Sequence, residues 1–269
     1  MPVYWFALSF IKSIDVINAV LIFLIIHILV YPSSNGYNSY MDRDTSSIGG
    51  IKNPLQPTQQ LLVFTVIMDV LSILLAFIIS PLIALCIFVY IFFSRIYSYR
   101  KIRLKKYAVV GYLVVILNQG GLIFFTVFHA ANTNANAATP WLGMLCATLL
   151  IGGFYPITQI YQHKDDAADN VKTISMLLGK KGTFIFCALV YAAAFALLFF
   201  YYNFTHQLFL FSILILFFVP VLIYFMVWFL QVKKDMSAAD FKHTMRMNKL
   251  ASACTNLAFI TLLILQQLD

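Results

Sequence analysis

Eight long apolar runs constrain this chain more than any other feature. They cover residues 14–32, 60–79, 82–97, 107–129, 140–161, 182–202, 207–231 and 248–267. Each has about the length that a helix needs to cross a hydrocarbon core. Because backbone groups in lipid find no water to bond, each run is expected to be helical. With 62% hydrophobic and 10% charged residues, the chain does not fit the soluble classes.

A ninth apolar segment, residues 1–11, is about half as long as a spanning helix. It is either a partial helix or the end of one that begins upstream, and it lacks the basic region and cleavage site of a signal peptide. The connections between the runs leave no room for a soluble domain. We therefore expect an all-α, polytopic membrane bundle of about nine transmembrane helices with a short first one, in a single domain over residues 1–269.

The basic residues predict the orientation in the membrane. Of the 18 Lys and Arg residues, 17 fall in the connections 33–59, 94–106, 162–181 and 232–249. The alternate connections, 130–140 and 203–206, contain no charged residue. By the positive-inside rule the charged connections face the cytoplasm, at the inner membrane if the source is bacterial. The net charge of +8 follows from this asymmetry, so it suits anionic lipid and gives no reason to expect a nucleic-acid partner.

Two polar islands on this side carry clustered aspartates. In the first, residues 38–44, Asn38 and Asp42 are four positions apart. On a helix their side chains would share one face, where an amide oxygen and a carboxylate could bind one cation. Asp44 would point elsewhere, and Ser46 would continue the face of Asp42. The alternative interpretation of this island is a solvated loop with a helix cap.

The second island, residues 162–169, holds Asp165, Asp166 and Asp169. All three carboxylates can crowd one face of a helix that leaves the membrane, and such crowding is costly without a cation. Lys164 and Lys172 would soften the repulsion, so a charge-balanced helix end is the alternative.

Other polar groups lie between the islands and inside the spans. Residues 97–106 hold five basic side chains, which suit phosphate oxygens or else only set the topology. Within the spans, Asp69, Asn118 and Gln119 are expected to face the bundle interior, because polar groups are costly in lipid. Asp69 is either a ligand in the site or a structural anchor. The Gly120–Gly121 pair favours close packing of its helix against a neighbour.

These features resemble the UbiA superfamily of intramembrane prenyltransferases over nearly the whole chain. Members carry an Asn-x-x-x-Asp-x-x-x-Asp motif after the second helix and an Asp-x-x-x-Asp motif after the sixth. The segment YPSSNGYNSYMDRDTSSIGGIKNP is similar to the first, and YPITQIYQHKDDAADNVKTISMLLG is similar to the second. Asp42 and Asp166 match the family pattern best, with Asn38 in support. At two positions where the family pattern has aspartate, this chain has Ser46 and Gln162. Asp44, Asp165 and Asp169 are the nearby aspartates that could take their place.

The resemblance implies Mg²⁺-dependent transfer of a prenyl group from an isoprenoid diphosphate to a lipophilic, aromatic acceptor, with release of pyrophosphate. It also implies a central cavity that opens laterally to lipid, and no obligate protein partner is inferred. The expected catalytic residues are Asn38, Asp42, Asp166 and Asp169, and the expected metal ligands are Asn38, Asp42, Asp165, Asp166 and Asp169. The expected substrate-binding residues are Arg43, Tyr97, Arg100, Arg103, Lys105, Asn118, Gln119, Tyr161 and Lys172.

Two other functions are compatible with parts of this pattern. A CDP-alcohol phosphotransferase also uses clustered aspartates and magnesium, but it keeps them in one contiguous motif, whereas here they occupy two connections. A transporter would use Asp69, Asn118 and Gln119 to line a substrate path, with solvated aspartates at the surface.

Overall fold

The computed structural model describes residues 2–43, 51 and 53–268, and over these residues it is a bundle of helices. Within this part of the chain, eight helices are long and apolar enough to cross a membrane. Six are α4 (Gln59–Ile79), α5 (Pro81–Ser98), α8 (Trp141–Thr158), α10 (Ile174–Phe204), α11 (Leu208–Lys234) and α12 (Phe241–Leu268). The other two are composite: α2 (Val16–Leu24), the π-helical η1 (Ile25–Val30) and α3 (Tyr31–Asp42) form one, and α6 (Ala108–Ile116), the π-helical η3 (Leu117–Leu122) and α7 (Ile123–Ala131) form the other. The predicted all-α, polytopic architecture and its eight spans are confirmed.

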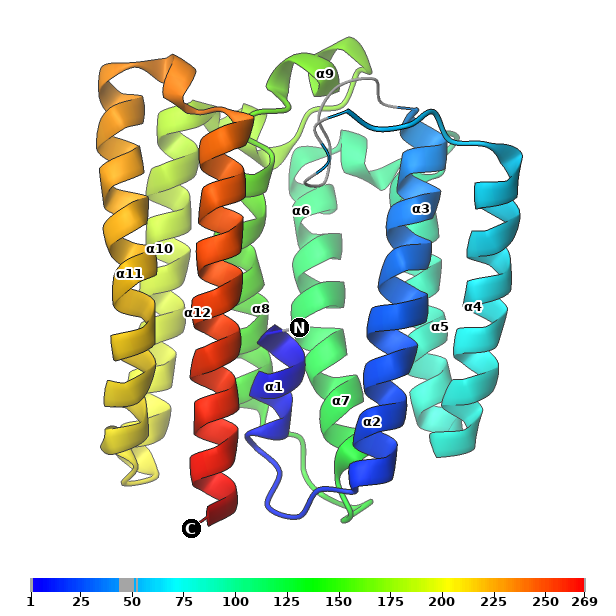
Figure 1. Ribbon diagram of the computed structural model, residues 1–269, viewed down its shortest axis with the longest axis vertical. Coiled ribbons are helices and arrows are strands. Elements are labelled where there is room, and N and C mark those ends of the chain that lie inside the picture. The colour runs from blue at the N-terminus through cyan, green and yellow to red at the C-terminus, as the bar shows by residue number, and fades with distance from the viewer. Residues whose placement is uncertain (1, 44–50, 52, 269) are drawn as a thin grey trace.

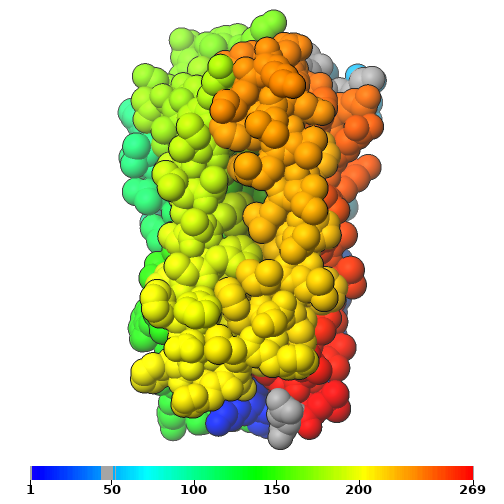
Figure 2. Space-filling view, turned by 90° about the vertical axis from the view of Figure 1, so that its left-hand side faces the viewer, coloured from blue at the N-terminus to red at the C-terminus, as the bar shows by residue number. Residues whose placement is uncertain are grey.

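The spanning helices run side by side along the long axis of the molecule (Figure 1). The end of α3 and the short helix α9 (His163–Ala168) lie at the same end of the bundle, so both islands are on one side. In Figure 2, α10 and α11 lie side by side and form one wall along most of the height of the bundle. Large apolar side chains such as Phe200 and Phe209 are exposed on these helices, as expected for a surface against lipid.

The predicted ninth segment forms the seven-residue helix α1 (Pro2–Leu8), which packs inside the bundle beside α7 and α12 (Figure 1). Its Phe6 is fully buried, with ring centroids 4.6 Å from Phe259 and 5.6 Å from Phe124. The polar residues after α1 turn the chain back, and the side chain of Asp15 caps the start of α2.

Three helices extend beyond the apolar runs that predicted them. The first composite helix continues to Asp42, α10 begins at Ile174, and α12 begins at Phe241. Hydropathy marks the part of a helix that lies in lipid, whereas a capped helix can continue into water. The side chain of Thr173 caps the start of α10 by accepting a hydrogen bond from the backbone N–H of Met176. The positive φ of Gly179 (69°) then interrupts the first turns of this helix.

Asp69 is an anchor between three helices. It accepts hydrogen bonds from Arg95 of α5 (Nε to Oδ2, 2.8 Å) and from Ser33 of α3 (Oγ to Oδ1, 2.5 Å). The guanidinium of Arg95 also stacks 4.0 Å from the ring centroid of Tyr37. A charge inside the membrane is therefore matched by an opposite charge, and α3, α4 and α5 are tied together.

The predicted packing role of the Gly120–Gly121 pair is confirmed. A Cβ on Gly120 would lie 2.5 Å from Cα of Thr148, so only glycine allows η3 to approach α8 this closely. This close approach holds η3, which contains Asn118 and Gln119, against α8, and α8 leads to the second island.

Candidate active site

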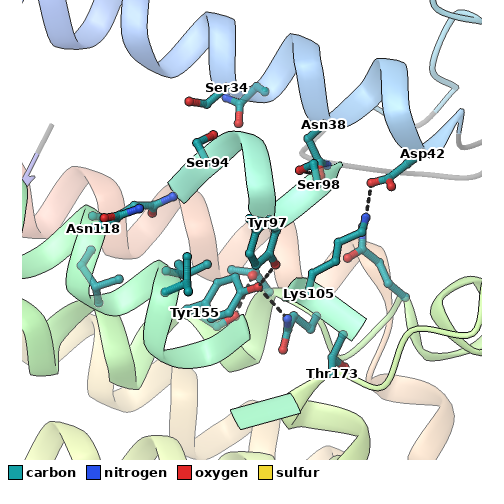
Figure 3. Close-up of a pocket in the computed structure, with 18 of the residues that line it drawn as sticks. Ser34, Asn38, Asp42, Ser94, Tyr97, Ser98, Lys105, Asn118, Tyr155 and Thr173 are labelled. Carbon is teal, nitrogen blue, oxygen red and sulfur yellow. Dashed lines mark hydrogen bonds and ion pairs between the residues drawn. The ribbon is translucent and has the colours of Figure 1, made fainter. Parts of the chain in front are cut away.

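A cavity of about 520 Å³ lies between the helices and carries both islands on its lining (Figure 3). Polar side chains of α3, α5, η3, α8, α9 and α12 line it, together with a smaller number of apolar ones. Asn118 and Gln119 lie in η3, and π-helical segments are frequent at functional sites. Asp69 is not part of the lining. The structural-anchor interpretation of Asp69 is therefore the one that the structure supports.

The first island is helical, as its spacing predicts. Asn38 and Asp42 project from one face of α3 into the cavity, and Ser34 lies one turn earlier on the same face (Figure 3). Oδ1 of Asn38 accepts a hydrogen bond from Oγ of Ser98 at 2.7 Å, which fixes the amide against α5. The helix ends at Arg43, whose backbone is left-handed (φ 54°). Asp44 of this island, and Ser46 beyond it, lie outside the described residues.

The second island forms α9 and the turn that follows it. Asp165 and Asp166 lie in the first turn of α9, where the positive end of the helix dipole favours carboxylates. Asp169 lies at the end of α9, and all three aspartates line the cavity together with Gln162. The three carboxylates therefore surround one cavity, although α9 is too short to present all of them on one helical face.

Arg103 and Lys105 join the two islands. Arg103 donates to Oδ1 of Asp42 at 3.3 Å and to a carboxylate oxygen of Asp169, and Lys105 donates to Oδ2 of Asp42. The side chains of Arg103 and Asp42 are only 9% and 3% exposed. Charges buried to this extent need close partners, so Arg103 holds the end of α3 to the turn after α9, and Lys105 adds a second cation at Asp42.

The ion pair of Asp169 with Arg103 predicts a specific pH dependence. Its hydrogen bond to Arg103 lowers the pKa of the Asp169 carboxyl below the usual value. The stability that this pair contributes is thus present above the unfolded pKa, about 3.9, and is lost as the pH falls through the lower folded pKa. In EDTA, the difference in Tm between wild type and Asp169→Asn should be constant from about pH 8 to about pH 5 and shrink below about pH 4. A difference that persists unchanged to about pH 3 would contradict the assignment of this pair.

Two tyrosine hydroxyls meet on the inner side of these charges. The Tyr97 and Tyr155 hydroxyl oxygens are 2.5 Å apart, and Nε2 of Gln159 donates to Tyr155 at 2.9 Å (Figure 3). Both rings line the cavity, and Tyr161 lines it nearer the second island. The site thus has a charged rim followed by a wall of aromatic and amide groups.

Several predicted site residues lie away from this lining. Arg43 and Lys172 are exposed and do not line the cavity. Arg100 donates from Nε to the backbone oxygen of Met41 at 2.6 Å, which places it at the rim. Among the described residues, no three acidic, His or Cys side chains converge closely enough to hold a metal ion by themselves. In the site as folded, Asp42 and Asp169 are paired with cations, and Asp165 and Asp166 line the same cavity.

Sequence reasoning missed part of the polar lining. Ser34, Ser94, Ser98, Gln159 and Asn248 all line the cavity but were not predicted as site residues. A signal existed for Ser94 and Ser98, because two serines four positions apart in an apolar run share one helical face. Asn248 comes from α12, which carries neither island, so only the fold shows its proximity.

The comparisons with known proteins agree with this fold. Solved structures with the same fold include a UbiA homologue from Archaeoglobus fulgidus bound to DMAPP and Mg²⁺, with 15% identity and a TM-score of 0.71. That match covers 99% of this chain and 93% of the other. The apo structure of a UbiA homologue from Aeropyrum pernix K1 has 15% identity and a TM-score of 0.66, with coverage of 97% and 95%. A structure described as digeranylgeranylglyceryl phosphate synthase has 18% identity and a TM-score of 0.63, with coverage of 100% and 91%.

At these identities the structural matches establish the fold alone. Among curated protein sequences, none matches the chain significantly. The model of the UbiA prenyltransferase family, however, matches residues 1–250, which is nearly the whole chain. A match of this extent favours a prenyltransferase over the phosphotransferase and transporter alternatives. The chain belongs to the UbiA prenyltransferase family.

Proposed function

We propose that this prenyltransferase joins an isoprenoid diphosphate to a lipophilic, aromatic acceptor in a Mg²⁺-dependent reaction on the cytoplasmic side of the membrane. The observation that carries the proposal is the pairing of Arg103 and Lys105 with Asp42 and Asp169, which brings both islands to the rim of one cavity. A diphosphate needs both cations and metal ligands, and this rim offers both. The cytoplasmic assignment rests on the basic connections, which lie on the same side as the islands.

The donor chemistry of the rim fits Mg²⁺. Hard oxygen ligands are available from Asn38, Asp42, Asp165, Asp166 and Asp169, all of which line the cavity. Because Mg²⁺ is usually bound by one or two carboxylates plus phosphate oxygens, the lack of a three-acid cluster among the described residues does not conflict with it. Bound Mg²⁺ would neutralise negative charge on the diphosphate as it leaves. Asp42 and Asp166 are the proposed principal ligands.

The basic side chains would change partners when substrate binds. Arg103 and Lys105 now neutralise carboxylates, and the same donors suit phosphate oxygens, bidentately in the case of Arg103. The diphosphate would compete with Asp42 for these cations, which frees the carboxylate to act as a ligand. Arg100, exposed at the rim, would add a third cation.

The inner wall suits the carbon that reacts. In the proposed reaction the C–O bond to the diphosphate breaks, its electron pair leaves with pyrophosphate, and a nucleophilic acceptor carbon or oxygen bonds to the allylic carbon and loses a proton. The rings of Tyr97, Tyr155 and Tyr161 line the cavity next to the charged rim. Their faces could stabilise positive charge on the allylic carbon.

Product analysis tests the proposed function. Membranes that contain the protein are incubated with labelled prenyl diphosphates of several lengths and a lipid extract, with Mg²⁺ or with EDTA. We expect a labelled lipid and pyrophosphate that both require Mg²⁺, and mass spectrometry of the lipid identifies the acceptor. Turnover of a CDP-alcohol with release of CMP, or flux into vesicles without Mg²⁺, would instead establish one of the alternative functions.

A further inference from the structure

The short helix α9, which carries the second island, is anchored at both of its ends. It lies at one end of the bundle (Figure 1). At the far end of α9, Asp169 accepts a hydrogen bond from Arg103. At its first residue, Nε2 of His163 lies 2.8 Å from Oγ of Ser175, in the first turn of α10. A helix of six residues is not stable by itself, so tertiary contacts of this kind decide where α9 lies.

The contact of His163 continues into the interrupted start of α10. Ser175 and Thr183 are fully buried, and their hydroxyl oxygens are 3.0 Å apart. In a continuous helix, residues eight positions apart are separated by about 12 Å. The break at Gly179 therefore brings the two hydroxyl groups together. The kink thus gives His163 a buried pair of hydroxyl groups to bind, which a straight helix would not offer.

The protons of this chain of hydrogen bonds run in one direction. Oγ1 of Thr183 lies 2.8 Å from the backbone oxygen of Gly179 and 3.2 Å from that of Ser175. Carbonyl oxygens only accept, so the Thr183 proton is used there and Oγ1 accepts from the hydroxyl of Ser175. Oγ of Ser175 must then accept from Nε2–H of His163. An N–H group at this ring position is what the buried end of the chain requires.

We propose that His163 is a positioning residue, which holds the first turn of α9 against Ser175 so that Asp165 and Asp166 stay at the rim of the cavity. The inference rests on the proposed function, in which Asp166 is a principal Mg²⁺ ligand. Asp165 and Asp166 follow His163 by two and three positions and line the cavity, whereas His163 does not. His163 therefore acts through these carboxylates and not on the substrate. Side chains that orient a metal ligand without touching the metal affect how tightly the metal complex binds.

Binding of pyrophosphate with Mg²⁺ tests this role without turnover. The Tm of the purified protein in a fixed detergent is measured with rising pyrophosphate, in excess Mg²⁺ and in EDTA. The pyrophosphate concentration that gives a fixed rise in Tm reports the affinity. In excess Mg²⁺, His163→Leu should need about ten times more pyrophosphate than wild type. His163→Gln should stay within about twofold, because the Gln side chain also offers an N–H group that can donate to Ser175.

Two further variants show whether the chain of hydrogen bonds is the cause. Ser175→Ala breaks the same chain from α10 and should weaken pyrophosphate binding in the same way. Combined with His163→Leu, it should add little to the effect of either change alone. Ala167→Leu is the control, because Ala167 is exposed on α9 and does not line the cavity, and it should bind as wild type does. If His163→Leu does not fold, Ser175→Ala decides the test.

A kinetic measurement separates positioning from a purely structural role. In excess Mg²⁺, the KM of His163→Leu for the prenyl diphosphate should rise about tenfold, while kcat stays within about threefold of wild type. A purely structural role would lower the Tm in EDTA and the amount of active protein, with KM and pyrophosphate affinity unchanged. That result overturns the inference and leaves prenyl transfer standing. A wild type that makes no product and shows no Mg²⁺-dependent rise in Tm would instead refute the proposed function, and the inference with it.

Discussion

Asp42→Asn and Asp166→Asn should each lower the rate of prenyl transfer by about a hundredfold or more. Each substitution removes a ligand charge and changes the side-chain volume little. Both carboxylates line the cavity, and the Asp42 side chain is only 3% exposed between Arg103 and Lys105. The rate is measured as labelled product per purified protein at saturating prenyl diphosphate and Mg²⁺.

The matched control is Asp235→Asn. Asp235 is an exposed aspartate in the connection between α11 and α12, outside the cavity, and an Asn there can still cap the turn by accepting from Ser237. This variant should retain the wild-type rate, which excludes a general effect of losing one acidic charge. Asp42→Asn should also lose stability, because it leaves Arg103 and Lys105 without this carboxylate, so rates are compared only for folded, purified protein whose gel-filtration profile matches wild type. Wild-type turnover in purified Asp42→Asn and Asp166→Asn would contradict the assignment of these two residues as the principal Mg²⁺ ligands.

Much of the site could be predicted from local spacing alone. Asn38 and Asp42 share a helix face because they are four residues apart, and the asymmetry of basic residues put both islands on one side. These are properties of one helix or of the chain's overall charge, so they need no tertiary information. The same holds for the eight spans, because lipid permits few other structures for such runs.

The pairings between islands could not be predicted. The contacts of Arg103 with Asp42 and Asp169 join residues 61 and 66 positions apart, and no local pattern encodes such partners. Arg103 also has a left-handed backbone (φ 51°), which periodicity does not reveal. The position of Asn248 in the lining likewise depends on tertiary contacts that local spacing does not encode. The sequence left two roles open for Asp69, and only the contact with Arg95 decides between them.

Asp69→Asn should destabilise the protein by about 3 kcal/mol, because it leaves the Arg95 guanidinium without its counter-charge. The side chains of Asp69 and Arg95 are only 15% and 18% exposed, so water cannot replace the lost partner fully. The neutral amide can still accept from Ser33, but it does not compensate the charge. The loss is measured as the shift of the unfolding midpoint in a fixed detergent, with Mg²⁺ absent.

The double variant Asp69→Asn with Arg95→Met distinguishes an ion pair from a packing effect. Removing both charges leaves no unpaired ion, so the double variant should recover most of the stability that Asp69→Asn loses. Arg95→Met alone should also be destabilised, because it leaves the Asp69 carboxylate unpaired in the membrane. If the effects of the two single substitutions simply add in the double variant, the pair does not couple α4 to α5. Coupling would establish that this charge pair joins α4 to α5, at the point where Ser33 of α3 is bonded to both side chains.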